Sequence, residues 1–135
     1  MNGWCSLRLR FDQRELALLR AAEQVRGVAL ARTPRPDDLR TALSLPRAGH
    51  KLASAAPGAS VSLEEQEVNL LLAALRYTMD EVQRAARSEN DQQSRQREAV
   101  AAAFPELTEL GGWRSFGLTR ELEALALRLQ TALAS

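Results

Sequence analysis

The stretch that decides the fold is Ser62-Leu63-Glu64-Glu65-Gln66-Glu67-Val68-Asn69-Leu70-Leu71. Ser62 is followed three residues later by Glu65, which is the spacing of the capping box that begins many helices. Beyond this start, apolar residues recur every three or four positions, and these are Val68, Leu71, Leu75, Met79, Val82 and Ala86. The spacing predicts one long amphipathic helix over residues 62–87. Further apolar residues beside this row, Tyr77 among them, predict that the helix is covered on two sides.

A second helix is predicted near the start of the chain by a similar opening. Asp12 and Glu15 have capping-box spacing, and Phe11 and Leu16 occupy the two positions of a hydrophobic staple. Apolar residues then recur as far as Gly27, which is a residue type that commonly ends helices. We therefore expect a helix over residues 12–26.

The third such opening, at Thr119, precedes a row of leucines near the end of the sequence. The row consists of Leu122, Leu125, Leu129 and Leu133, at the spacing of one helix face. Burying a leucine side chain contributes about 1.5–3 kcal/mol, so a row of four requires cover. We predict a final helix over residues 118–134 that docks on the long helix or on a partner.

Two shorter helices complete the predicted set. Pro36, with acidic residues after it, predicts a short helix over residues 36–45 that ends at Pro46. The polar residues 88–97 are either a turn or exposed helix, and we favour a turn, with a short apolar helix over 99–104 after it. Pro105 ends this last segment, because proline disfavours helical geometry in the residue before it.

Together these segments predict a mainly α fold, a compact bundle of about five helices with residues 62–87 as its central helix. We divide the chain into a basic helical segment 1–45, a linker 46–61 rich in Ala, Ser, Gly and Pro, and an acidic helical part 62–135. A chain of 135 residues has the length of one domain, so we expect the two helical parts to pack together.

Before the first helix, Ser6-Leu7-Arg8-Leu9-Arg10-Phe11 alternates between polar and apolar residues, which predicts a short extended segment. We find no second alternating run in the chain. The segment therefore pairs with another copy, or is an extended arm, or only leads into the helix, and we favour the last interpretation.

The same segment gives residues 6–45 a partial resemblance to ribbon-helix-helix DNA-binding proteins. In such proteins, strands from two copies pair and enter the major groove. The resemblance implies that Ser6, Arg8 and Arg10 would contact DNA. The sequence departs from that pattern where Thr33-Pro34-Arg35-Pro36 lengthens the connection between the first two helices.

Charge is unevenly distributed along a chain whose net charge is +1. Residues 1–60 hold ten basic and five acidic residues, a balance of +5, whereas residues 61–135 hold eight and twelve, a balance of −4. Either the split is a chance distribution of surface charge, which we favour, or the halves attract each other, or the basic half faces a polyanion. The sequence predicts a cytoplasmic protein without a membrane span. It contains one cysteine, and it has neither a signal-like start nor an apolar run of about 18 residues.

Candidate catalytic and metal-binding residues are few. We interpret His50 as a surface residue in the linker, Cys5 as unreactive, and Glu64, Glu65 and Glu67 as the charged first turn of a helix. Metal sites need several converging ligands, and phosphate loops need a lysine at fixed spacing after glycine. The sequence shows neither pattern, so we expect no metal, no cofactor and no enzymatic activity.

The most unusual segment is Gly111-Gly112-Trp113-Arg114-Ser115-Phe116-Gly117. Trp113 and Phe116 either fill the bundle as a plug, which we favour, or form a binding loop with Arg114, because aromatic residues and arginine dominate interface hot spots. The first functional hypothesis is a non-enzymatic protein–protein interaction or assembly protein that binds a protein partner or itself as a homodimer. The alternative is a small DNA-binding regulator that uses Ser6, Arg8 and Arg10.

Overall fold

The first helix of the computed structural model, α1 (Gln13–Arg32), begins where two side chains satisfy free backbone amides. The N–H of Glu15 donates to Asp12 Oδ1 at 2.7 Å, and the N–H of Asp12 donates to Glu15 Oε1 at 3.0 Å. Phe11 and Leu16, which flank this cap, are both buried. The predicted capping box is confirmed, and the staple residues lie in the core as the prediction requires.

The structure describes residues 6–32, 39–87, 102–103 and 112–134. Within them the elements follow the order β1 (Ser6–Arg10), α1, α2 (Leu39–Ala53), β2 (Ser60–Glu64), α3 (Glu65–Arg87) and α6 (Gly112–Ala134). The mainly α fold is confirmed, but these described residues form four helices in place of about five. The predicted turn at 88–97 lies outside the described residues, and of the predicted helix 99–104 only Ala102 and Ala103 are described, both helical.

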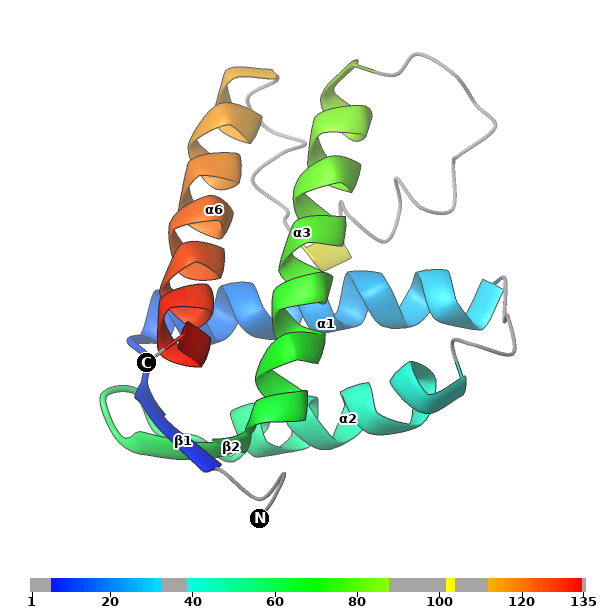
Figure 1. The fold of residues 1–135 in the computed structure, drawn as a ribbon. Helices are drawn as coiled ribbons and strands as arrows, with labels where there is room; N and C mark the ends of the chain where they lie inside the picture. The colour runs from blue at the N-terminus through cyan, green and yellow to red at the C-terminus, as the bar shows by residue number, and fades with distance from the viewer. Residues whose placement is uncertain (1–5, 33–38, 88–101, 104–111, 135) are drawn as a thin grey trace.

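The helices form two antiparallel pairs that cross each other (Figure 1). In this view α3 and α6 stand side by side, and α1 and α2 run across behind and below them. Of the four helices, α3 alone packs closely against each of the other three. The prediction that the long helix is covered on two sides is confirmed.

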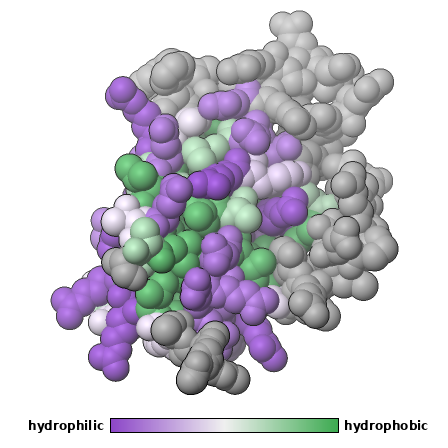
Figure 2. Space-filling view, viewed as in Figure 1, coloured by the Kyte–Doolittle hydropathy of each residue, from purple (hydrophilic) through white to green (hydrophobic). Residues whose placement is uncertain are grey.

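One hydrophobic core draws residues from every one of these elements. Its centre is the apolar face of α3, where Val68, Leu71 and Leu75 are completely buried. From α6, the leucines at positions 122, 125 and 129 pack into it, as the leucine row predicts. Figure 2 shows hydrophobic residues surfacing between polar ones over the α3–α6 pair.

Two helices continue past the residues expected to end them. Gly27 lies inside α1, although glycine costs about 1 kcal/mol relative to alanine in a helix interior. The continuation buries Leu30 in the core, which offsets this cost.

Pro46 lies inside α2, where it removes one backbone hydrogen bond. Burial of Leu45 and Leu52 in the core compensates, so the predicted linker 46–61 is in fact helical up to Ala53.

The N-terminal strand has a partner within the chain, contrary to prediction. β1 pairs antiparallel with β2, in a register that places Arg8 opposite Ser62 and Arg10 opposite Ser60. Val61 and Leu63 of β2 are buried under the ribbon, and Leu7 and Leu9 of β1 pack partly against the same core. The alternation in Ser60-Val61-Ser62-Leu63-Glu64 is therefore a strand pattern, and β2 occupies the end of the predicted linker.

A small residue permits close approach of α1 and α2. Gly49 of α2 is buried, and a Cβ atom at this position would lie 2.7 Å from Glu23 Cδ of α1. Burial of Glu23 raises the pKa of its carboxyl above the ordinary value of 4.5, and the nearby Arg20 opposes this by lowering it. The α1–α2 interface therefore contains a carboxylate that is poorly solvated at neutral pH.

Two leucines of α6 provide a matched test of the core. Leu122 is 0% exposed and Leu127 is 61% exposed. We expect Leu122→Ala to lower the free energy of unfolding by about 2–5 kcal/mol, because it removes buried methyl groups and leaves a cavity. Leu127→Ala should change it by less than about 0.5 kcal/mol. Equilibrium unfolding in urea measures both, and an equal loss at the two positions would contradict this packing.

The raised pKa of Glu23 predicts a pH dependence of stability. In the window between 4.5 and the higher folded pKa, the native state binds more protons than the unfolded state. The free energy of unfolding therefore falls as pH rises through this window. We expect Glu23→Gln to stabilise the protein at pH 7–8 and to lose this advantage near pH 4. Thermal melts across this pH range should show no such trend for Glu123→Gln, a change at an exposed position.

Candidate functional site

A cleft of about 550 Å³ lies between the second half of α2 and the start of α3. The continuation of α2 past Pro46 builds one wall, because Arg47 and Lys51 are four residues apart and share a helix face. The end of β2 and the first turn of α3 build the other wall. The lining residues are Ser44, Pro46, Arg47, His50, Lys51, Glu64, Gln66 and Glu67.

Glu67, one of the residues that line this cleft, makes two contacts through one carboxylate oxygen. Its Oε1 accepts a hydrogen bond from Lys51 Nζ at 2.6 Å and another from the N–H of Glu64 at 2.9 Å. The second contact is half of a capping box in which Glu64 is the N-cap. The predicted pair of Ser62 and Glu65 is wrong by two residues, because Ser62 lies in β2 and the helix begins only at Glu65.

The two side chains of this ion pair differ in their exposure to solvent. The Glu67 side chain is 7% exposed, whereas that of Lys51 is 40% exposed. A buried carboxylate needs partners, since removing it from water costs several kcal/mol, and here an ammonium and a backbone amide supply them. The pair therefore fixes the position of α2 relative to the start of α3.

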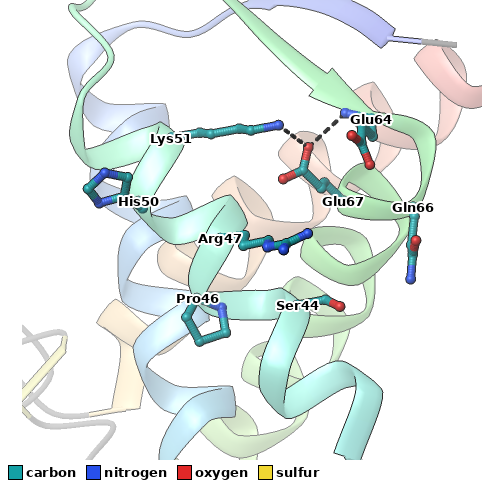
Figure 3. A pocket seen from close by; sticks show the side chains of 8 residues that line it. All are labelled: Ser44, Pro46, Arg47, His50, Lys51, Glu64, Gln66 and Glu67. Atoms are coloured by element: carbon teal, nitrogen blue, oxygen red, sulfur yellow. Dashed lines mark hydrogen bonds and ion pairs between the residues drawn. The ribbon is translucent and has the colours of Figure 1, made fainter. Parts of the chain in front are cut away.

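Two further charges of the cleft remain available for a ligand. Arg47 extends from α2 toward α3, whereas the ring of His50 points away from Glu67 (Figure 3). Within the described part of the chain, the side chains of Arg47 and Glu64 form no hydrogen bond or ion pair. Arginine can bind a carboxylate through two parallel hydrogen bonds, and Glu64 can accept from a basic group. The cleft therefore presents one cation and one anion beside a fixed ion pair.

The predicted DNA-contacting residues lie together on β1. Ser6, Arg8 and Arg10 are all exposed, as the alternation predicts. The structure places Ser60 and Ser62 of β2 beside them on the same outward face. The guanidinium of Arg128, from α6, contacts the carbonyl oxygen of Arg10 and thereby links the ribbon to the last helix.

Trp113, Arg114 and Phe116 do not form a loop between glycines. All three lie in the first turns of α6, which begins at Gly112, and their side chains are outside the described part of the structure. Arg128 lies about 20 Å further along the same helix, at a rise of about 1.5 Å per residue. The aromatic segment and the β1 arginines are therefore at opposite ends of α6 (Figure 1).

The described residues contain neither a metal-binding cluster nor a membrane-spanning helix. In ranges 6–32, 39–87, 102–103 and 112–134, no three His, Cys, Asp or Glu side chains are grouped as a metal ion would require. No helix in those ranges has the length and apolar character needed to span a bilayer.

The cleft residues were not identified from the sequence, although a signal was present. Arg47 and Lys51 have the spacing of one helix face, but that relation matters only if the helix continues through Pro46. Glu64 and Glu67 have the spacing of a capping box, and the neighbouring pair Ser62 and Glu65 has the same spacing with a more favoured cap residue. Local rules alone favour the wrong pair.

Comparisons with known proteins do not assign a family. No protein-family model, no curated protein and no solved structure matches the chain.

The Lys51–Glu67 pair can be tested with a double-mutant cycle against a matched exposed pair. Arg14 and Glu121 form that second pair, at 2.8 Å, with both side chains more than 40% exposed. We expect a coupling energy of about 1 kcal/mol for Lys51→Ala with Glu67→Gln, because Glu67 is poorly hydrated. The cycle of Arg14→Ala with Glu121→Gln should give about 0.2–0.5 kcal/mol. Equal couplings in urea unfolding would contradict the buried position of Glu67.

Proposed function

We propose that this chain is a non-enzymatic protein-interaction protein that binds a charged segment of a partner in the α2–α3 cleft. The observation that supports the proposal is the pair of unengaged charges, Arg47 and Glu64, on opposite walls of one cavity. A segment with a carboxylate and a basic side chain in neighbouring positions would pair with both. The Lys51–Glu67 contact holds the two walls in place before binding, which lowers the ordering cost of association.

A second copy of the chain is one candidate for the partner. The acidic half, residues 61–135, and the basic half, residues 1–60, give each copy surfaces of both signs. Leu127 of α6 is also exposed, and it is a large hydrophobic side chain that a partner could cover. Self-association as a homodimer remains a prediction, and native mass measurement over a range of concentrations tests it.

The cleft proposal can be tested with an array of short peptides that carry adjacent acidic and basic residues. The full-length protein should bind a subset of them, and Arg47→Ala should weaken that binding by about tenfold, as expected for a bidentate arginine–carboxylate contact. Glu64→Gln should weaken it for peptides whose basic residue is essential. Fluorescence polarisation with the selected peptides measures both effects.

Arg120→Ala serves as the control, because Arg120 is an exposed arginine of α6 outside the cleft. It should leave peptide binding unchanged. Binding that is insensitive to Arg47 and Glu64, or equally reduced by Arg120→Ala, would refute the cleft as the interaction site.

A further inference from the structure

The β1–β2 ribbon has one face packed on the core and one face open to solvent. Exposed arginine and serine side chains occupy five positions of its open face, which are Ser6, Arg8, Arg10, Ser60 and Ser62, and Glu64 stands at the end of β2 opposite Ser6. Both strands come from one chain and are already paired, and β1 is further held by the contact between Arg128 and the Arg10 carbonyl. The ribbon is therefore formed without a second copy.

The dimensions of the ribbon suit the major groove of DNA. That groove is about 12 Å wide and admits a two-stranded antiparallel ribbon, whose strands lie about 4.8 Å apart. Successive residues on one face of a strand are about 7 Å apart, which is close to two base-pair steps. Arg8 and Arg10 therefore lie at a spacing that lets each reach its own base pair.

The chemistry of the face also suits a base-reading surface. Arginine donates two hydrogen bonds to guanine in the major groove, and serine bonds to several bases. The register pairs each arginine with a serine across the ribbon, Arg8 with Ser62 and Arg10 with Ser60. Arg10 Nε lies 3.5 Å from Ser60 Oγ, so these two side chains extend over the same part of the face.

The carboxylates near the open face of the ribbon either contact other groups or lie at the end of the face. Glu15, at the start of α1, is paired with Arg128 and also caps the helix. Asp12 accepts from the N–H of Glu15. Glu64 lies opposite Ser6, at the far end of the ribbon from Arg10. Arg8 and Arg10 therefore dominate the charge at the centre of the face.

We propose that the outward face of the β1–β2 ribbon binds duplex DNA in the major groove, as a function separate from the α2–α3 cleft. Arg8 and Arg10 contact base edges or phosphates, and Ser60 and Ser62 contact the same base pairs from the second strand. The outward face of the ribbon is thus a DNA-binding surface that one chain forms before it meets DNA.

The test is fluorescence polarisation of the full-length protein with a labelled duplex of mixed sequence, at about 50–200 mM salt. We expect the affinity to fall steeply with salt. Arg8→Ala with Arg10→Ala should weaken binding by roughly tenfold or more and lower the salt slope by about 2. Ser62→Glu should also abolish binding, because it places a negative charge opposite Arg8 on the second strand.

The matched control is Arg76→Ala with Arg120→Ala, which removes the same charge from exposed positions on α3 and α6. It should retain most of the affinity. Circular dichroism and thermal melts confirm that every variant is folded. The proposal is overturned if the wild-type protein does not bind duplex DNA at low salt, if the control pair loses as much affinity as the ribbon pair, or if single-stranded DNA binds equally well.

Discussion

The fold depends on the need of α3 (Glu65–Arg87) to cover an apolar surface that extends around about half of its circumference. Val68, Leu71 and Leu75 are fully buried, and positions flanking them on both sides are buried as well. A single neighbour covers only a stripe of a helix, so α3 requires cover from two directions. The α1–α2 pair supplies one side and α6 supplies the other, which produces the two crossed layers of the structure.

Charge pairs tie the basic and acidic halves together but contribute less than the core. Arg14 to Glu121 and Lys51 to Glu67 each join a cation of residues 1–60 to an anion of residues 61–135. A third pair joins Arg128 of residues 61–135 to Glu15 of residues 1–60, so the ion pairs do not all follow the split of net charge along the sequence. Exposed pairs contribute about 0–1 kcal/mol, whereas a fully buried leucine contributes about 1.5–3 kcal/mol, so burial sets the arrangement and charge refines it.

Most of the helical framework follows from local sequence, and its errors have physical causes. The cap at Asp12 and the leucine row of α6 are determined by neighbouring residues and were predicted. Pro46 and Gly27 were expected to end helices because their intrinsic cost is local, whereas the compensating burial comes from distant parts of the chain. The β1–β2 ribbon joins residues about 50 positions apart, and the cleft exists only after α2 continues past Pro46. Neither the ribbon nor the cleft can be derived from local patterns alone.

Helix α3 is the shared core of a single cooperative unit, and native-state amide hydrogen exchange tests this most directly. We predict that the slowest amides lie in the centre of α3, and that α1 and α6 lose their protection together with it as denaturant is added. Exchange of the α1–α2 pair at a separate, lower free energy, while α3 and α6 remain protected, would contradict this account.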